Sequence, residues 1–245
     1  MANRQRAEAR RKAQAKAARV SGEGGGNRWA IWAGLVAVVA VVVGIVVFVG
    51  RDDSSSNAGS ETSDSSAASN LPDSQPVTVT GDALARFDSA TTPDPAVGVT
   101  APLLTGKNFA GETITIDPAA NGPYMIVFLA HWCPHCNAEV PVLNAWKHSG
   151  AVPADLNVVG VATAVSAASA NYPPATWFSN KGWEWPVMVD EAKGDGEAGK
   201  AAEAYGASGW PYFVVIGADG QVKLRVSGEV KASELTSLIT TALAA

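Results

Sequence analysis

The chain has 245 residues, 47% of them hydrophobic and 17% charged, which is enough for one globular domain with extensions. Its net charge of −5 conceals an asymmetry, because residues 1–28 carry eight of the 18 basic residues and only two of the 23 acidic ones. Two cysteines and three histidines, at spacings that match no known zinc pattern, argue against a metal site. We expect no metal and no cofactor.

Residues 29–50 form an apolar stretch that follows the basic tail of residues 1–28. About twenty of them in succession carry no charge, enough for a helix to cross a bilayer core of about 30 Å. A cleavable signal peptide would have a shorter apolar core and a small-residue cleavage site, whereas Arg51-Asp52-Asp53 follows here. We therefore predict an uncleaved, single-pass transmembrane anchor.

Lys and Arg are retained on the cytoplasmic side of a membrane span, so residues 1–28 are predicted to be cytoplasmic and the rest extracytoplasmic. The basic tail is interpreted as this topology signal, and no nucleic-acid partner is expected. Residues 51–76 are rich in Ser, Asn, Asp and Gly and predict a disordered linker. Residues 77–100 form an N-terminal extension of uncertain structure, with a possible strand at 77–80 and a possible helical turn at 82–87.

From residue 101 the pattern is that of a globular α/β domain, which we assign to residues 101–245. A hairpin over 101–116 precedes a series of strands and helices. The strands are expected at 124–130, 157–162, 186–189, 212–216 and 221–227, and the helices at 134–147, 199–205 and 231–243. Residues 163–186 are a Trp-rich insert, for which packing over the sheet is favoured and a substrate groove is the alternative.

The only two cysteines stand at the start of the helix predicted over 134–147, two residues apart. A thiol at the first turn of a helix faces unpaired backbone N–H groups and the positive end of the helix dipole, which favour the thiolate. Cys133 is therefore the expected nucleophile, and Pro134 fits the first helical position. Cys136 lies one turn further on, close enough to form a disulfide with Cys133 but more sheltered.

His135 lies between the two cysteines and, when protonated, adds a positive charge beside the sulfur. A structural disulfide is a poor alternative, since closing two intervening residues constrains little of the unfolded chain. Thiol–disulfide exchange is the better account of the pair.

Further motifs follow one another along residues 101–245. They are Ala101-Pro102 with Gly111, residues 128–136 around Cys133-Pro134-His135-Cys136, Pro186 to Asp190, Tyr205 to Pro211, and Ile216 to Gly220. In this order they resemble the thioredoxin superfamily, and specifically the membrane-anchored TlpA/ResA-like thiol–disulfide oxidoreductases. The resemblance implies a thioredoxin-like fold, with a mixed central sheet flanked by helices.

The resemblance also implies roles for individual residues. Cys133 is the cysteine that attacks the substrate, and Cys136 is the one that resolves the mixed disulfide. The other motif residues, which tune the pKa of the thiols, are Trp132, Pro134, His135 and His131. Pro211 matches the family's cis-proline, so Trp210 and Pro211 are the implied substrate-binding residues.

Two positions depart from the family pattern. Val127 stands where many thioredoxins bury an acidic residue, and His131 is either a partial substitute or, as we favour, a partly exposed histidine at the strand end. The inner dipeptide Pro134-His135 is like that of the strongly oxidising enzyme DsbA, unlike the surrounding scaffold.

The expected function is an extracytoplasmic protein thiol–disulfide oxidoreductase, acting on protein thiols and disulfides. We favour an oxidase because stabilising the thiolate makes the disulfide a stronger oxidant. A reductase of the TlpA/ResA type, as in cytochrome c maturation, is the alternative. For an oxidase, the membrane redox partner would be a quinone-linked oxidase; for a reductase, it would be a membrane electron carrier.

Two further alternatives are weaker. A thiol peroxidase wants Thr or Ser three residues before its reactive cysteine, and Ala130 stands there. A non-catalytic adaptor would not need an intact dithiol together with Pro134 and Pro211.

Overall fold

A computed structural model of the protein describes residues 71–245. The basic tail predicted over 1–28, the membrane span predicted over 29–50 and the linker up to residue 70 lie outside the described residues. Residues 71–76, the end of that linker, contain no helix or strand. In the described part of the chain, none of the helices combines the length and the apolar character that crossing a membrane requires.

The central strand β4 (Tyr124–Leu129) is six consecutive buried residues. Its side chains alternate between two apolar clusters, with Ile126 and Phe128 on one face and Val127 and Leu129 on the other. A strand covered on both faces is hydrophobic without interruption. The prediction of a buried strand before the dithiol motif is therefore confirmed.

The other strands extend the sheet on both sides of β4. They are β1 (Thr78–Thr80), β2 (Leu103–Lys107), β3 (Thr113–Ile116), β5 (Asn157–Ala162), β6 (Val187–Val189), β7 (Tyr212–Ile216) and β8 (Val222–Ser227). Their order is β1-β2-β6-β5-β4-β7-β8, with β3 paired to β2. Because β4 runs parallel to β5 and antiparallel to β7, the sheet is mixed, as the sequence predicted.

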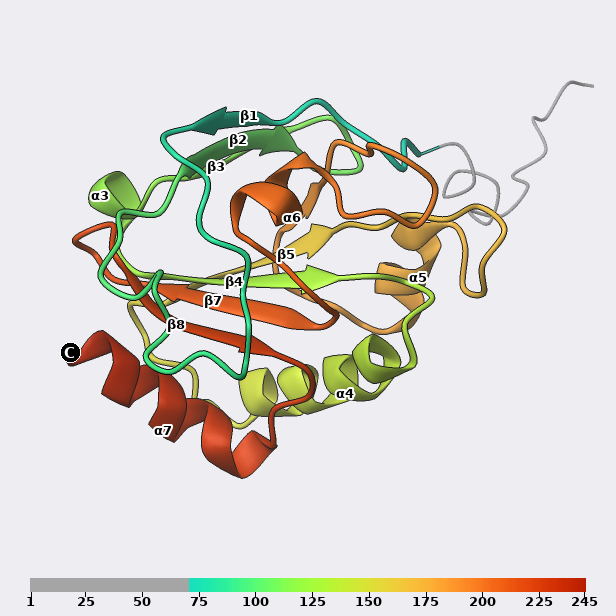
Figure 1. Ribbon diagram of the computed structural model, residues 1–245. Coiled ribbons are helices and arrows are strands. Elements are labelled where there is room, and N and C mark those ends of the chain that lie inside the picture. The colour runs from blue at the N-terminus through green and yellow to red at the C-terminus, as the bar shows by residue number, and fades with distance from the viewer. Residues whose placement is uncertain (1–70) are drawn as a thin grey trace, which may run out of the picture. The chain divides into compact units, whose positions relative to one another are not determined.

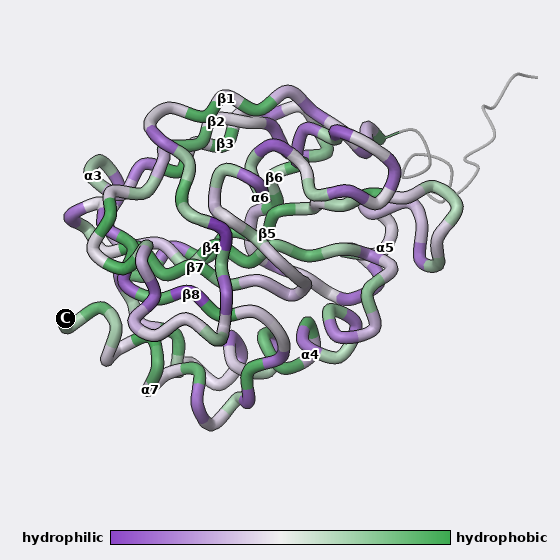
Figure 2. Tube along the Cα trace, in the orientation of Figure 1, coloured by the Kyte–Doolittle hydropathy of each residue, from purple (hydrophilic) through white to green (hydrophobic). Residues whose placement is uncertain are grey.

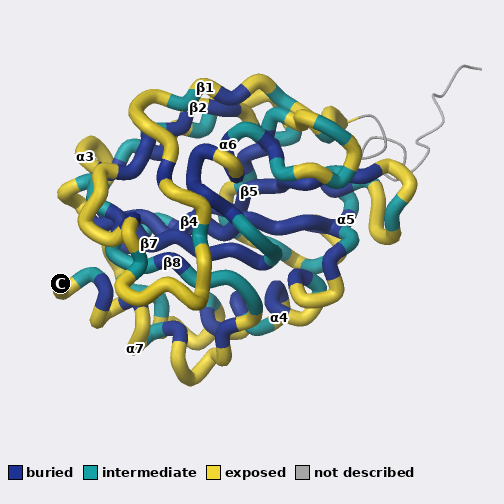
Figure 3. The backbone as a smooth tube through the Cα atoms, viewed as in Figure 1, coloured by how far each residue is buried: buried dark blue, intermediate teal, exposed yellow. Residues whose placement is uncertain are grey.

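Helices cover both faces of this sheet (Figure 1). The apolar sides of α4 (Pro134–His148), α5 (Pro174–Asn180) and α7 (Ala232–Leu243) share one cluster, while α6 (Lys200–Ala204) packs into the other. A short helix, α3 (Pro118–Asn121), precedes β4. Hydrophobic residues concentrate in the central strands (Figure 2), which are also the most buried part of the backbone (Figure 3).

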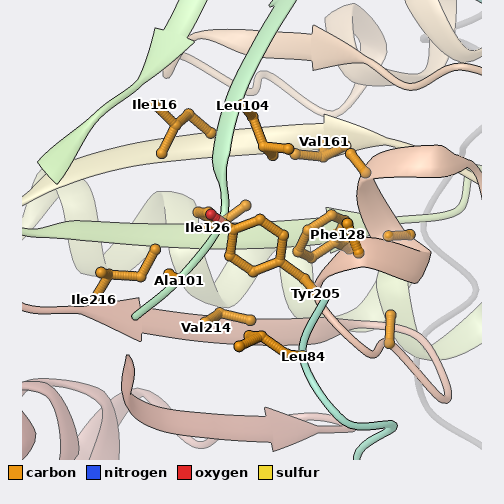
Figure 4. Close-up of a cluster of buried hydrophobic side chains, with 14 of the residues drawn as sticks. Leu84, Ala101, Leu104, Ile116, Ile126, Phe128, Val161, Tyr205, Val214 and Ile216 are labelled. Atoms are coloured by element: carbon orange, nitrogen blue, oxygen red, sulfur yellow. The ribbon is translucent and has the colours of Figure 1, made fainter. Parts of the chain in front are cut away.

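The cluster on the α6 side joins distant parts of the chain (Figure 4). Leu84 and Ala101 pack there with Leu104, Ile126 and Tyr205. Residues 77–100, predicted as an extension of uncertain structure, thus contribute a buried side chain to this cluster, and β1 pairs antiparallel with β2.

The helical turn predicted at 82–87 is wrong. Leu84 N–H donates to the Ala204 carbonyl and Phe87 N–H donates to the Gly206 carbonyl, both at 2.8 Å. These partners belong to the end of α6 and the turn after it. Residues 84–87 therefore run in an extended conformation along the C-terminal end of α6. Gly206 permits the close approach, because its φ is +69° and a Cβ there would collide with the Ala85 carbonyl oxygen.

The Trp-rich insert contains helix α5, which was not predicted. Pro174 occupies the first turn of this helix, a common helix-start signal that the sequence did carry. Trp177 is 3% exposed, and Trp183 lies against Gly160 of β5, where a Cβ would meet its ring at 3.0 Å. Packing over the sheet, the favoured interpretation of this insert, is therefore confirmed for these two side chains.

A buried ion pair fixes the extended segment to β8. The Arg225 side chain is fully buried, and its Nε donates to Asp94 Oδ2 at 2.8 Å. Its Nη1 donates to the Ala85 carbonyl at 2.6 Å. The hydrogen bond from Arg225 lowers the pKa of Asp94. Removing one partner would leave the other charge buried and uncompensated.

We predict that Asp94→Ala destabilises the protein by about 3 kcal/mol, because Arg225 would lose its counter-ion while remaining buried. Since the folded pKa of Asp94 is lowered, the contribution of the pair is present above the ordinary Asp pKa and is lost as pH falls through the lowered value. Urea denaturation followed by tryptophan fluorescence measures both effects. Asp88→Ala, which removes an exposed turn carboxylate, is the control and is expected to cost less than about 1 kcal/mol. Equal losses in the two variants would contradict the prediction.

Candidate active site

The dithiol motif begins where β4 ends and α4 starts. Cys133 is the N-cap residue of α4, with extended backbone angles, and Pro134 follows in the first turn. The Cys133 carbonyl accepts a hydrogen bond from Asn137 N–H at 3.0 Å. Because β4 is held on both sides by neighbouring strands, the position of this helix start is set by the core of the sheet. The predicted placement of Cys133 at a helix N-terminus is confirmed.

The two thiols are free and differ in their surroundings. Cys133 is 5% exposed, and its thiol donates to the Trp210 carbonyl at 3.4 Å. Cys136 has no exposed surface, so it is the more sheltered cysteine, as predicted. Burial raises the pKa of the Cys136 thiol far above its ordinary value, and the nearby charges of Cys133 and Glu139 raise it further. Cys136 is thus protonated at neutral pH in the reduced protein.

The Trp210–Pro211 peptide bond is cis, as the resemblance implied for Pro211. Trp210 is half-buried, and its carbonyl is the acceptor for the Cys133 thiol. The Pro211 carbonyl accepts a hydrogen bond from Gly228 N–H at 2.8 Å. The structure therefore brings the two predicted substrate-binding residues against the predicted nucleophile.

His135 and Pro134 are exposed at the surface beside the thiols. The imidazole Nδ1 of His135 lies 2.7 Å from Glu229 Oε1, and the two side chains are 68% and 49% exposed. Glu229 is thus the counter-ion of His135 whenever the imidazole is protonated, although water screens an ion pair this exposed. The sequence did not indicate this contact, because the two residues lie 94 positions apart.

His131 is 1% exposed, so the expectation of a partly exposed histidine is wrong. Its Nδ1 lies 2.9 Å from the Ala170 carbonyl, and its Nε2 accepts from Ser166 N–H at 3.3 Å. A carbonyl only accepts and an N–H only donates, so the imidazole is neutral, with its proton on Nδ1. Burial also lowers the pKa of His131. This side chain holds the insert in place and is not free to take a proton from Cys136.

Trp132 makes a similar contact with the insert. Its indole N–H donates to the Ala164 carbonyl at 2.7 Å. Both motif residues before Cys133 therefore fasten the insert to the start of α4.

Glu139 is a buried carboxylate that sequence reasoning missed. It lies on α4 three residues after Cys136, on the side of the helix that also buries Val140 and Leu143, and is 1% exposed. Its Oε2 accepts from Val230 N–H at 3.0 Å, while its Oε1 has no hydrogen-bond partner among the described residues. Burial raises the pKa of Glu139 to about 7, and the charge of Glu229 adds to the effect.

The signal for Glu139 was present in the helix pattern. An acidic residue stands at a core-facing position, one turn from Cys136, where the stripe of a surface helix is normally apolar. Val127, where many thioredoxins bury their acid, is itself fully buried on the adjacent strand. Glu139 thus supplies the buried carboxylate that Val127 does not.

Residues 97–225 match the AhpC/TSA family. The chain belongs to this family. Its α/β domain is thioredoxin-like, and this part of the prediction is confirmed. A search of curated proteins finds no significant match.

Three solved structures are among those similar in fold. A thiol:disulfide interchange protein from Chlorobium tepidum is 23% identical over 59% of this chain and 95% of its own, with a TM-score of 0.46. StoA from Bacillus subtilis is 19% identical over 59% and 98%, with a TM-score of 0.44. A secreted disulfide oxidoreductase from Mycobacterium tuberculosis is 22% identical over 56% and 94%, with a TM-score of 0.43.

We predict that Glu139→Gln stabilises the protein at alkaline pH. The amide can still accept from Val230 N–H but carries no charge to bury. Because the folded pKa of Glu139 is raised, the wild type loses stability as pH rises from about 4.5 to about 7, and the variant does not. After allowance for screening by nearby solvent, the difference in unfolding free energy should grow by about 1–2 kcal/mol over that range.

Urea denaturation of both proteins at several pH values measures this difference. Glu234→Gln, which removes an exposed carboxylate at the start of α7, is the control. A gap between Glu139→Gln and wild type that stays constant with pH would show that Glu139 ionises normally in the folded protein.

Proposed function

We propose that this protein is a protein thiol–disulfide oxidoreductase that exchanges disulfides through Cys133 and Cys136. The observation that carries the proposal is the placement of Cys133. Its sulfur lies at the start of α4, 3.4 Å from the carbonyl that precedes Pro211, with Cys136 fully buried one turn behind it. Membership of the AhpC/TSA family and the thioredoxin-like fold support it.

In the oxidising direction, a substrate thiolate attacks Cys133 of the Cys133–Cys136 disulfide. A bond forms between the substrate sulfur and Cys133, the intramolecular S–S bond breaks, and Cys136 leaves with the electron pair and takes up a proton. A second substrate thiolate then attacks the first substrate sulfur and releases Cys133 as a thiolate. The substrate is oxidised to a disulfide, and the dithiol of the enzyme is left reduced.

In the reverse direction, Cys133 attacks a substrate disulfide and Cys136 resolves the mixed disulfide. Cys136 must first lose its proton, which its burial opposes. Glu139, one helical turn away with a pKa raised to about 7, is suited to accept that proton at neutral pH. The same carboxyl returns a proton to Cys136 in the oxidising direction.

We favour the oxidising direction because the His135 imidazolium would stabilise the Cys133 thiolate and thereby the reduced enzyme. We also propose that residues 29–50 anchor the chain and that the domain acts outside the membrane, on the basis of the apolar run and the charge asymmetry of the sequence. Re-oxidation would then require a quinone-linked membrane partner. A reductase would instead receive electrons from a membrane carrier.

We predict that Cys136→Ser traps a covalent mixed disulfide with a disulfide-containing substrate protein. Its Cys133 thiolate opens the substrate disulfide, one substrate cysteine leaves as a thiolate, and the thiol that would resolve the adduct is absent. Cys133→Ser is expected to form no adduct. Mass spectrometry before and after reduction with dithiothreitol detects the adduct. Adducts of equal yield in both variants would contradict the assignment of Cys133. Turnover that depends on peroxide and persists without protein thiols would favour a thiol peroxidase instead.

We predict that His135→Ala lowers the reduction potential of the dithiol by roughly 30 mV, a tenfold change in the equilibrium with glutathione. The loss of the imidazolium would destabilise the reduced form. His148→Ala is the matched control, since His148 is an exposed histidine paired with Glu184 at the far end of α4. An equal shift in both variants would refute a specific role for His135. A wild-type potential above about −150 mV supports the oxidase, and one below about −230 mV supports the reductase.

A further inference from the structure

A polar cavity of about 230 Å³ lies beside the dithiol helix. Its walls come from Asn137 of α4 and from residues 171–181 of the insert, which include α5. In Figure 1, α5 is drawn near the end of α4 that begins with the motif, and the hydrogen bond from Trp177 Nε1 to Asn137 Oδ1, at 2.9 Å, joins the two helices. The mechanism proposed above does not use this cavity.

Lys181 carries the only charge among the residues that line the cavity. Among the described residues it forms no ion pair, whereas six of the other basic side chains do. Asn171, Asn180 and Thr176 add two amides and a hydroxyl to the wall. Asp73 accepts from the Tyr172 hydroxyl at 2.5 Å at one rim, so this carboxylate contacts a lining residue but is not itself part of the lining.

The sequence of α4 explains why the ammonium group is fixed there. Pro141 lies inside the helix and has no N–H, so the Asn137 carbonyl lacks its usual helical donor. Lys181 Nζ donates to this carbonyl at 3.3 Å, and the Lys181 carbonyl accepts from Asn144 at 2.7 Å. An ammonium group has three donors, so two remain for a ligand. The ammonium group and the backbone carbonyl of Lys181 are both hydrogen-bonded to α4, so the positive charge is held in place before a ligand binds.

The cavity is close enough to the dithiol to contact the same substrate. Asn137 follows Cys133 by four residues, which is about 6 Å along a helix axis and returns to nearly the same face. Its side chain also donates to the Cys133 carbonyl at 3.0 Å. A ligand bound to Lys181 lies farther away than Asn137, by the 3.3 Å hydrogen bond from Lys181 Nζ to the Asn137 carbonyl and by a second hydrogen bond of about 3 Å. An extended polypeptide advances about 3.3 Å per residue, so these separations correspond to a position roughly two to four residues from a cysteine bound at Cys133.

We propose that this cavity binds the carboxylate of an Asp or Glu side chain in the protein substrate, roughly two to four residues from the cysteine that exchanges with Cys133. Lys181 is then a specificity-determining residue for the thiol–disulfide exchange proposed above, on which this inference rests. The carboxylate would accept charge-assisted hydrogen bonds from Lys181 and neutral ones from the amides. The insert thereby has a role in substrate choice in addition to packing.

The test uses the oxidised full-length chain and pairs of short peptides with one central cysteine. The two peptides of a pair differ only in Glu or Gln at a flanking position. The rate constant for reduction of the Cys133–Cys136 disulfide, followed by tryptophan fluorescence, is expected to be roughly three- to tenfold higher for Glu at the matching position. This preference should shrink as salt is added, because a partly exposed charge pair is screened.

Variants assign the preference to Lys181. Lys181→Gln should lower the ratio of the Glu and Gln rates to about one, whereas Lys181→Arg should retain it, since a guanidinium also reaches both carbonyl and carboxylate. Lys107→Gln is the matched control, an exposed lysine on β2 without an ion pair among the described residues, and should keep the wild-type ratio. Circular dichroism of Lys181→Gln checks that α4 is intact.

Two outcomes would overturn the inference. Equal rates for Glu and Gln peptides at every position would exclude a carboxylate site, and a preference that persists undiminished in Lys181→Gln would place it elsewhere. Failure of the proposed function is distinguishable. In that case no peptide of either kind would react with the disulfide, and no adduct to Cys133 would form.

Discussion

The site depends on one junction, the passage of the chain from β4 into α4. β4 is hydrogen-bonded to β5 on one side and β7 on the other, and both of its faces are buried. The strand end therefore has little freedom, and α4 begins at a position that the core determines. Cys133 is aimed at the Trp210 carbonyl by this constraint. His131 and Trp132 extend it, because both use their ring nitrogens to attach the insert to the strand end.

The polar groups around the dithiol are divided between water and the core. His135 and Glu229 form their ion pair at the surface, where solvent screens it. Cys136 and Glu139 are buried, and burial raises the pKa of each. The surface pair can influence the attacking sulfur through charge. The buried pair controls where a proton is held, which is a separate requirement of thiol exchange.

Much of this arrangement could be predicted from the sequence, and the parts that could not have physical reasons. A continuous apolar run and a dithiol at a helix start are local patterns, so β4, α4 and the place of Cys133 followed from them. The extended course of residues 82–87 depends on carbonyls of Ala204 and Gly206, more than a hundred residues later, and local propensity favoured a turn. The helix pattern places Glu139 on the core-facing side of α4, but its hydrogen-bond partner, Val230 N–H, lies 91 residues later and could not be inferred. His131 was misjudged because its partners, Ser166 and Ala170, lie in the insert.

Three successive residues after β8 meet three different parts of the site. Gly228 holds the Pro211 carbonyl, Glu229 pairs with His135, and Val230 covers Glu139. A displacement of residues 228–230 would therefore change three things together: the backbone at Pro211, the charge beside His135, and the protonation of Glu139. The shape of the loop at Pro211, the electrostatic potential at the dithiol and the pKa of Glu139 are therefore coupled. A substitution in residues 228–230 that adjusts one of them will disturb the others.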